Sequence, residues 1–409
     1  MKRLAILTGN HLCHNPRVLK EATSLVQAGY AVEVLGAWFD PGLKRKDQEL
    51  LDRASFTFTP VVDLTRDSFA RTVGRAKSKL GRLAHKLFGI ESEWQLGPGI
   101  AALKKAAYEI GADFFIAHSE SGMVVAAELL KRGKAVGIDM EDWFSEDLLP
   151  EARKQRPLKL LRRLETELLR SGAYKTCTSH AMAEALAHEY GCKPPVVIYN
   201  AFPWSDRKTV DRLIRDRKNR QLPSIHWYSQ TLGPGRGLED LIAALPFLQR
   251  EAEIHLRGSP TSDFSELLAT VPESWRNRVF VNDLVSNEEL LSRIAEHDIG
   301  FAGEQKFCRS RDLTVTNKIL HYLLAGLAVV ASDTPGQQEV AIQAQGAVDL
   351  YRAGDPQDLA TKLNVLLSPA AKVVQAKAAA LAAAKETFCW EKQAAKLLRA
   401  VEAGLQRTG

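Results

Sequence analysis

Short apolar runs alternate with helical patterns along most of the chain, and no other feature constrains the fold as strongly. Residues 4–8 read as a strand, residues 9–15 as a loop and residues 16–28 as a helix, which Gly29 ends before a second strand at 31–35. Further strands are predicted at 114–117, 135–138, 175–178 and 196–199. Strands that alternate with helices form a parallel sheet that helices cover on both faces.

The same alternation starts again after a charged stretch at residues 206–220. A strand at 225–229, a loop at 230–236 and a helix at 237–248 precede strands at 253–256, 279–281, 299–302, 328–331 and 348–350. We therefore predict an α/β protein with two tandem Rossmann-like, doubly wound domains over 1–205 and 206–388, and a C-terminal helix over 389–409 that packs back on the first domain. Ligands of such sheets bind beyond the carboxyl ends of the strands, so we expect the site in a central cleft between the domains.

Composition and motifs exclude several other classes of protein. The five cysteines show no CxxC spacing, which argues against a zinc ribbon or a disulfide framework and favours a reducing compartment. The apolar run near the N-terminus spans only residues 4–7, whereas a signal peptide needs about 7–15 apolar residues. No stretch approaches the roughly 18 apolar residues of a membrane span. We expect a cytoplasmic protein whose contact with a membrane, if any, is peripheral.

The net charge of +6 is concentrated in two segments. Residues 66–88 contain seven Lys or Arg and one Asp, and residues 153–170 contain seven Lys or Arg and two Glu. Apolar residues recur at helical spacing through the first segment, at Phe69, Val73, Leu80, Leu83 and Leu87. A basic amphipathic helix over Arg66 to Phe88 can lie on anionic lipid, or it can pack on its own domain with a solvated basic face. We expect no nucleic-acid partner, because no zinc finger or RNP motif accompanies the charge.

Two segments of the second domain suit an anionic ligand. Gly233, Gly235 and Arg236 follow a strand and precede a helix, where glycines allow close approach and an arginine binds phosphate in a bidentate manner. Alone, this loop also fits a plain turn. The second segment lies before the apolar helix at 319–326. Thr316 or Asn317 can cap the start of that helix, or can leave the N–H groups of the helix free to bind a diphosphate. Arg311 and Lys318 are the cations of this segment that could neutralise the diphosphate.

Polar side chains follow two strands of the first domain. His118 comes directly after the strand at 114–117, and Glu141 and Asp142 follow the strand at 135–138. A histidine exchanges protons near neutral pH, and carboxylates bind hydroxyls or act as a base. These residues could equally cap helices or be satisfied by the backbone. No HExxH, DxD or paired CxxC motif is present, so we expect no metal.

The chain resembles the large glycosyltransferase family 4, whose members have the GT-B fold. The resemblance rests on Asn-Pro-Arg-Val at 15–18 with Gly-Tyr-Ala-Val at 29–32, on Val-Ile-Tyr-Asn-Ala at 197–201, and on the long match over 316–333. It covers almost all of the chain. It implies that the first domain binds the acceptor and the second domain binds a nucleotide-sugar.

The resemblance also assigns roles to residues. Family members bracket the diphosphate with an Arg and a Lys, and here Thr231 and Arg236 stand at these positions, so another cation must compensate. The family's Glu-x7-Glu pair falls on Leu313 and His321; Glu304 and Asp312 have its spacing in another register. We predict that His118, Glu141 and Asp142 are catalytic; the resemblance supports His118, and the position after a strand supports the two carboxylates. The resemblance implies donor binding by Gly9, Gly233, Gly235, Arg236, Arg257, Leu284, Arg311, Asp312, Thr316, Asn317, Lys318 and His321.

The sequence therefore predicts a glycosyltransferase that moves a sugar from a nucleotide-sugar to a lipid-linked or polysaccharide acceptor. We expect retention of the anomeric configuration, no metal and no cofactor besides the donor substrate. We expect a cytoplasmic protein that can bind peripherally to the cytoplasmic face of a membrane. We expect it to take part in the biosynthesis of cell-envelope polysaccharide. Two alternatives stay open, namely another GT-B enzyme such as a nucleotide-sugar epimerase, and a nucleotide-binding scaffold without catalysis.

Overall fold

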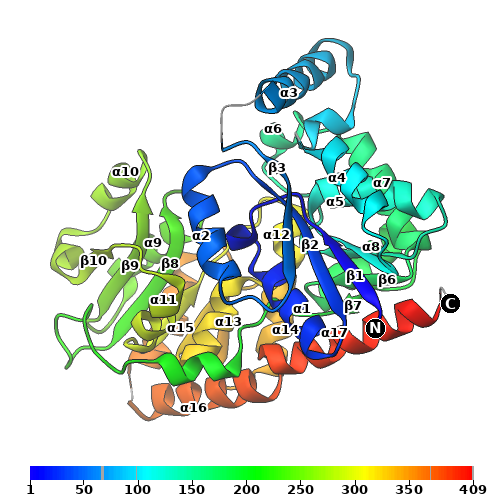
Figure 1. Ribbon diagram of the computed structural model, residues 1–409. Helices are drawn as coiled ribbons and strands as arrows, with labels where there is room; N and C mark the ends of the chain where they lie inside the picture. The colour runs from blue at the N-terminus through cyan, green and yellow to red at the C-terminus, as the bar shows by residue number, and fades with distance from the viewer. Residues whose placement is uncertain (66–68, 98, 369, 408–409) are drawn as a thin grey trace. The chain divides into compact units, whose positions relative to one another are not determined.

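The structure is a computed structural model that describes residues 1–65, 69–97, 99–368 and 370–407 (Figure 1). The chain divides into two compact units. The N-terminal unit comprises residues 1–198, 308–310 and 394–409, and the C-terminal unit comprises residues 199–307 and 311–393. We predicted a boundary between residues 205 and 206, whereas the structure divides the chain after Ile198. The first three residues of the predicted segment Arg66 to Phe88, and residues 408–409 of the predicted C-terminal helix, lie outside the described residues.

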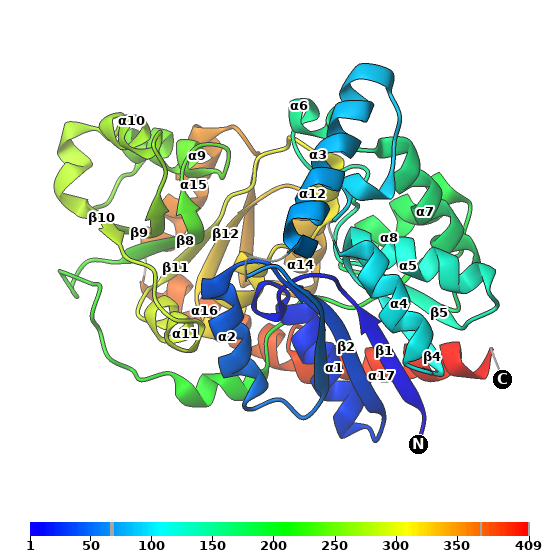
Figure 2. The ribbon, with the colours of Figure 1, turned by 45° about the horizontal axis from the view of Figure 1, so that its top comes forward.

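The N-terminal unit contains a parallel seven-stranded sheet in the order β3-β2-β1-β4-β5-β6-β7. The helices α4 and α5 cover one face of this sheet, and α1 and α17 cover the other (Figure 2). The strands are β1 Arg3–Leu7, β2 Ala31–Trp38, β3 Thr57–Asp63, β4 Phe114–Ala117, β5 Val136–Met140, β6 Tyr174–Cys177 and β7 Val196–Val197. The helices are η1 Leu12–His14, α1 Pro16–Gln27, α2 Pro41–Leu51, α3 Phe69–Phe88, η2 Glu93–Gln95, α4 Ile100–Glu109, α5 Ser119–Lys131, α6 Pro150–Arg153, α7 Leu158–Ser171, α8 His180–Tyr190 and α17 Trp390–Gln406, which begins in the C-terminal unit.

The C-terminal unit contains a parallel six-stranded sheet in the order β10-β9-β8-β11-β12-β13. Its strands are β8 Ser224–Leu232, β9 Glu253–Pro260, β10 Val279–Asn282, β11 Ile299–Ala302, β12 Ala328–Ser332 and β13 Val348–Tyr351. Its helices are η3 Trp204–Thr209, α9 Leu238–Ala244, η4 Leu245–Phe247, α10 Phe264–Ala269, η5 Glu273–Arg278, α11 Asn287–Ala295, α12 Arg309–Leu313, α13 Asn317–Ala325, α14 Pro335–Gln343, α15 Pro356–Leu367 and α16 Ala370–Glu386; α12 begins in the N-terminal unit.

The predicted strands are all present, with shifts of a few residues at their ends. They were visible because a parallel strand covered on both faces reads as a continuous apolar run. The edge strand β3 was not predicted, because its side chains are only half-buried and it contains Pro60, which an edge strand tolerates. The predicted loop at 230–236 was too long, since β8 continues to Leu232. The predicted helix at 237–248 is α9 followed by the 3-10 helix η4, which begins with Leu245 and Pro246.

Both sheets reverse their strand order next to their first strand. β1 lies between β2 and β4, and β8 lies between β9 and β11. Successive connections therefore leave such a strand pair in opposite directions, and the loops after the two strands leave space at the carboxyl edge of the sheet. The segments after β1, β4, β8 and β11 contain most of the predicted site residues. Within the described residues, no single helix is both long and apolar enough to cross a membrane; α15 and α16 meet that test only together, across a bend of 98°.

Candidate functional site

A buried network of charged side chains lies at the carboxyl ends of β4 and β5. Arg17, on α1, forms two hydrogen bonds with Asp139 on β5, from Nε to Oδ2 at 2.5 Å and from Nη2 to Oδ1 at 3.0 Å. A third N–H donates to the carbonyl of Ile198 at 2.7 Å. Although burial opposes both charges, the pairing raises the pKa of Arg17 and lowers the pKa of Asp139. Both groups are therefore ionised at neutral pH.

His118 extends this network. Its Nδ1 lies 2.6 Å from Oε1 of Glu141, and its Nε2 lies 3.1 Å from Oε2 of Glu21. Burial alone would lower the pKa of His118, but the charge of Glu21 and the two hydrogen bonds raise it well above the usual value of 6.5. The imidazole is fully buried, and both of its nitrogens are engaged by carboxylates. Sequence reasoning did not select Arg17 or Glu21, although two opposite charges four residues apart on a helix are a recognisable pairing signal.

Glu141 is the member of the network that a substrate can reach. Its side chain is 21% exposed, and its Oε1 also accepts a hydrogen bond from Nδ2 of Asn15 at 2.8 Å. Asp142 is exposed in the turn that follows β5. The structure therefore brings His118 and Glu141 together but gives them different surroundings, because only Glu141 contacts solvent.

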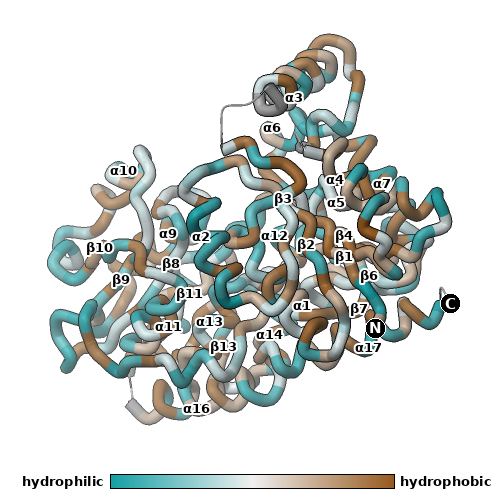
Figure 3. Tube along the Cα trace, in the orientation of Figure 1, coloured by the Kyte–Doolittle hydropathy of each residue, from teal (hydrophilic) through white to brown (hydrophobic). Residues whose placement is uncertain are grey.

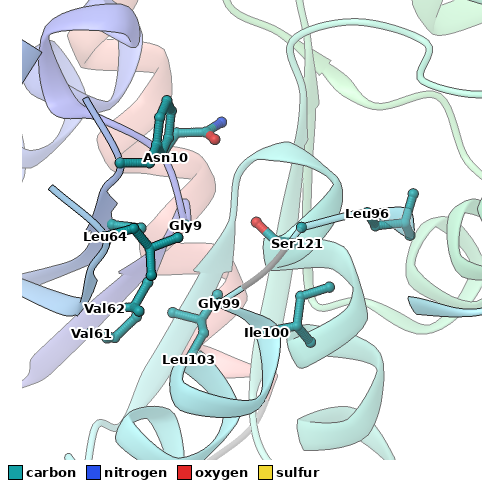
Figure 4. Close-up of a pocket in the computed structure, with 13 residues that line it drawn as sticks. Gly9, Asn10, Val61, Val62, Leu64, Leu96, Gly99, Ile100, Leu103 and Ser121 are labelled. Carbon is teal, nitrogen blue, oxygen red and sulfur yellow. The ribbon is translucent and has the colours of Figure 1, made fainter. Parts of the chain in front are cut away.

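A pocket of about 60 Å³ opens at the carboxyl edge of the same sheet (Figure 4). Polar groups border it at Asn10 and at Ser121, whose hydroxyl donates to the carbonyl of Thr8 at 3.1 Å. Gly9 has a positive φ of 62°, and a Cβ there would lie 2.3 Å from the Ser121 hydroxyl oxygen, so the turn requires glycine. Most of the wall is apolar and comes from Ala37, Phe39, Val61, Val62, Leu64, Leu96, Ile100 and Leu103. At about 60 Å³ the pocket admits only a small, mainly apolar group, since pockets that enclose a whole ligand usually measure roughly 300–1,000 Å³.

In the C-terminal unit, the loop after β8 carries a cation with few contacts. Arg236 is half-buried and donates one described hydrogen bond, from Nη1 to the hydroxyl of Ser229 at 3.2 Å. The N–H of Gly235 already donates to the carboxylate of Glu239 at 2.5 Å. Thr231 lies on the strand itself, before the glycines Gly233 and Gly235. Arg236 can therefore turn towards an anion without breaking an ion pair among the described residues.

The other predicted cations are held by acidic or carbonyl partners. Arg257 is buried and donates to Asp216 and to the carbonyl of Asp283. Nζ of Lys318 lies 2.6 Å from Oε1 of Glu304, and Nη1 of Arg311 lies 3.6 Å from Oε2 of the same carboxylate. Glu304 follows β11 and is buried, so it fixes both cations at the carboxyl edge of the sheet. In the sequence, Glu304 was noted only because it lies eight residues before Asp312, a spacing that does not align with the acidic pair of the resembling family.

Three predicted residues lie on the first turns of α13 or just before them. The Thr316 side chain makes no hydrogen bond that caps the helix, and its hydroxyl oxygen is buried with no partner among the described residues. The Asn317 side chain contacts that of Asn200 at 3.1 Å. His321 Nδ1 lies 2.6 Å from the hydroxyl of Tyr228, and the His321 ring stacks on that of Phe202 with centroids 3.4 Å apart. This end of α13 therefore offers N–H groups and a hydroxyl to an anion.

The remaining predicted donor residues have different surroundings. Asp312, on α12, has a pKa that burial raises, and one of its carboxyl oxygens has no hydrogen bond within the described part of the chain. Leu284 is exposed in the segment after β10. Arg257 and Leu284 thus belong to the β9 and β10 side of the sheet, whereas Arg236 and the α13 residues flank β8 and β11.

Two groups of described residues have the composition of a metal site, and hydrogen bonds already engage both. One is Glu21, His118 and Asp139, in the network above. The other is His11, Cys13 and Asp47. His11 Nε2 accepts from two backbone N–H groups, at 2.9 and 3.1 Å, so its proton lies on Nδ1, which donates to Asp47 at 2.8 Å. Burial raises the pKa of Cys13 to about 12, so it is not a ready thiolate ligand.

Comparisons with known proteins agree with this architecture. Residues 225–369 match the family model described as Glycosyl transferases group 1. The chain is similar to the solved structure of HepE from Anabaena in complex with UDP, at 18% identity and a TM-score of 0.69, over 98% of this chain and 100% of that one. Sucrose-phosphate synthase from Thermosynechococcus elongatus matches at 15% identity and a TM-score of 0.69, over 98% of both chains.

A UDP-forming α,α-trehalose-phosphate synthase from Burkholderia xenovorans matches at 14% identity and a TM-score of 0.69, over 98% of this chain and 99% of that one. No curated protein is similar enough in sequence to match the chain. The two parallel sheets, their strand order and these similarities lead to one conclusion: the chain has the GT-B fold, and its residues 225–369 match the family model of the glycosyl transferases group 1.

Proposed function

We propose that this protein transfers a sugar from a UDP-sugar to a glycan or lipid-linked acceptor. The observation that carries the proposal is the carboxyl edge of the C-terminal sheet. There, the half-buried Arg236 and the start of α13, with its buried Thr316 hydroxyl, flank the strand pair β8 and β11. The match to a glycosyltransferase family and the complexes of HepE with UDP and with UDP-glucose support a UDP-linked donor.

The chemistry of such a transfer requires stabilisation of the leaving diphosphate. The helix N-terminus carries partial positive charge, and Arg236 adds a full charge in the loop after β8, whereas Glu304 already compensates the charge of Lys318. This arrangement would neutralise a departing UDP without a metal ion. We propose retention of the anomeric configuration on the resemblance to glycosyltransferase family 4 alone, because charge at the leaving group does not set the stereochemistry. His321 and Tyr228 form a polar pair suited to a ribose hydroxyl.

On the N-terminal unit, Glu141 is the group that we assign to contact the acceptor or the transferred sugar. His118 acts as a positioning residue, because it holds the Glu141 carboxylate without reaching solvent. The pocket beside Gly9 would take an apolar group of the acceptor. A lipid-linked precursor of cell-envelope polysaccharide has this chemistry, and residues 66–88 are the part of the chain that would meet the cytoplasmic face of its membrane.

A nucleotide-binding scaffold without catalysis is the second candidate. It is favoured by Leu313 and His321, which stand where the resembling family carries its acidic pair, and by Glu239, which occupies a loop N–H that could bind phosphate. A nucleotide-sugar epimerase would form product from the donor alone, without an acceptor.

Thermal unfolding with UDP, GDP, ADP, TDP and CMP, with and without EDTA, tests the donor site. We expect stabilisation by UDP alone, of about 2.7 kcal/mol at 100 times Kd, with no effect of EDTA.

Arg236→Ala should weaken UDP binding by roughly 1.5–3 kcal/mol, because a charged hydrogen bond is lost. The matched control is Arg250→Ala, an exposed arginine before β9, which should bind UDP as the unaltered protein does.

Incubation with UDP-sugars then separates the candidates. Release of UDP that depends on an added acceptor supports the transferase, and a new sugar isomer from the donor alone supports the epimerase. UDP binding with no turnover in any acceptor mixture supports the scaffold. Failure of all the nucleotides to stabilise the protein would refute the donor site.

A further inference from the structure

Two basic segments of the N-terminal unit each contain an amphipathic helix, and these two helices have different surroundings. Residues 66–88 and 153–170 carry seven Lys or Arg each. On α7, the apolar residues Leu161, Leu164 and Leu168 are buried in the unit. On α3, Leu80, Leu83 and Leu87 are exposed instead. This contrast points to a role for α3 that α7 does not share.

The packed face of α3 is made of small residues. Gly74 and Gly81 are buried, and a Cβ on Gly81 would lie 3.2 Å from atoms of Ser92 and Trp94 at the η2 turn. Helical geometry places residues 80, 83 and 87 on the opposite side from 74 and 81. Leu80, Leu83 and Leu87 are accordingly 57%, 52% and 60% exposed. A helix that only completed a soluble unit would bury its leucines and expose its small residues.

The exposed apolar surface continues beyond the end of the helix. Phe88 and Ile90 are 73% and 57% exposed. Figure 3 shows hydrophobic residues recurring along α3 and the segment after it, and in Figure 1 α3 stands away from the sheet of its unit. We name Leu80, Leu83 and Leu87 the apolar face of α3, and Phe88 and Ile90 extend the exposed apolar surface at the end of the helix. Exposed apolar residues that gather in this way mark an interaction surface rather than a scattered background.

The charges beside this face distinguish α3 from α7 again. Lys79, Arg82 and Lys86 are exposed next to the apolar face and have no ion pair among the described residues. On the segment that contains α7, Arg153 and Arg162 pair with Glu146 at 2.7 and 2.9 Å, Arg156 pairs with Glu120, and Lys154 pairs with Glu151. The second segment is therefore largely neutralised by the protein itself, whereas the cations of α3 are available to an anionic partner.

We propose that α3 lies on an anionic lipid surface, with its apolar face in the boundary between headgroups and acyl chains and with Lys79, Arg82 and Lys86 at the headgroups. An interfacial helix needs an apolar face bordered by cations, and both are exposed here. The proposal deepens the acceptor side of the proposed function. Along the chain, α3 follows the pocket-lining residues Val61, Val62 and Leu64 and precedes the pocket-lining residues Leu96, Gly97, Gly99 and Ile100, so the proposal connects the membrane-bound segment with the chain that forms the pocket.

Flotation of the purified protein with lipid vesicles tests the proposal without donor or acceptor, so its result is independent of the transferase activity. We expect the protein to float with vesicles of phosphatidylcholine mixed with phosphatidylglycerol, and not with phosphatidylcholine alone. Leu83→Glu with Leu87→Glu should reduce partitioning at least about tenfold, because two inserted leucines are lost. Arg82→Gln with Lys86→Gln should reduce it about 25-fold at low salt, at about fivefold per cation near the surface.

The matched control removes the same charge from α7. Lys159→Gln with Arg163→Gln, both exposed, should leave partitioning unchanged. Equal binding to neutral vesicles, undiminished binding of the leucine variant, or equal loss in the α7 variant would each overturn the proposal. A self-association that the leucine variant abolishes, without flotation, would instead assign the face to a second copy of this chain. A fall of several degrees in the melting temperature of the leucine variant would show that the leucines are packed, and would also overturn it.

Discussion

At the scale of single residues, the network around His118 joins a buried interior to one exposed carboxylate. Arg17 and Asp139 compensate one another in the interior, and His118 connects them through Glu21 to Glu141. Buried ion pairs contribute little net stability, but removal of one partner leaves an uncompensated charge. The network therefore constrains the position of Glu141 more than it stabilises the unit, and this separates the expected effects of two substitutions.

Glu141→Gln should lower turnover at least about tenfold with little change in melting temperature, since the side chain is partly exposed and glutamine keeps the shape. His118→Ala should destabilise the N-terminal unit by about 1–3 kcal/mol, because Glu21 loses one hydrogen bond in the interior and keeps its ion pair with Arg17. Thermal unfolding and steady-state kinetics with a UDP-sugar measure the two effects. Loss of stability in Glu141→Gln, or full stability in His118→Ala, would contradict this assignment. His118→Gln is a useful control, because its amide can restore one of the two hydrogen bonds.

At the scale of elements, three buried histidines pack together in the C-terminal sheet. His226 on β8 pairs in register with His255 on β9. The His297 ring stacks on that of His226, with centroids 4.6 Å apart, and lies tilted against that of His255, with centroids 4.7 Å apart. Burial lowers the pKa of all three, and repulsion within the group lowers the pKa of His226 and His255 further. The folded unit therefore holds neutral histidines that the unfolded chain protonates near pH 6.5.

This cluster predicts a loss of stability in mild acid. Because the folded pKa values lie below the unfolded value, the contribution is present above about pH 6.5 and is lost as the pH falls below it. Replacement of the imidazole in His226→Leu should flatten this dependence, and no described hydrogen bond is lost with it. Urea unfolding at about pH 7.5 and about pH 5.5 measures the difference. An unchanged pH dependence in the variant would contradict the prediction. His118 has the opposite sign, since its pKa is raised, so the unfolding of each unit must be followed separately.

At the scale of the whole molecule, the chain crosses between the units more than once. Residues 394–409 belong to the N-terminal unit although they follow the last helix of the C-terminal unit. Leu397 and Val401 of α17 are fully buried, and a Cβ on Gly404 would lie 3.1 Å from the ring of Phe114 on β4 and 3.4 Å from the Cβ of Tyr174 on β6. The end of the chain is therefore part of the core of the N-terminal unit.

Leu397→Ala should destabilise the N-terminal unit by about 2–5 kcal/mol, the usual cost of a cavity at a buried leucine. Hydrogen exchange should then show faster exchange in β4 and β6 and little change in β8 and β11. The matched control is Leu363→Ala on α15, in the core of the C-terminal unit, which should have the reverse effect. Faster exchange of β8 and β11 in the Leu397 variant would show that α17 supports the other unit.

Local sequence was sufficient for the fold, because both of its signals act over short distances. Each strand of a sheet covered on both faces is a continuous apolar run. Helices commonly begin or end at capping residues, which bind the free backbone groups of the adjacent turn. Gly326, for example, ends α13 with a positive φ of 80°, as its place after the apolar helix indicated. The location of His118, Glu141, Arg236 and Thr316 at strand ends or helix starts followed from the same patterns.

What each of those side chains contacts was decided by tertiary structure. Arg17 meets Asp139 across 122 residues, and Lys318 meets Glu304 across 14, and neither pairing has a local pattern. The helices α3 and α7 show the same limit, since their sequences share charge and periodicity and only packing determines which leucines are buried. Periodicity records that a helix has an apolar face. Whether protein, lipid or water covers that face depends on residues distant in sequence, because burial is a property of the packed chain.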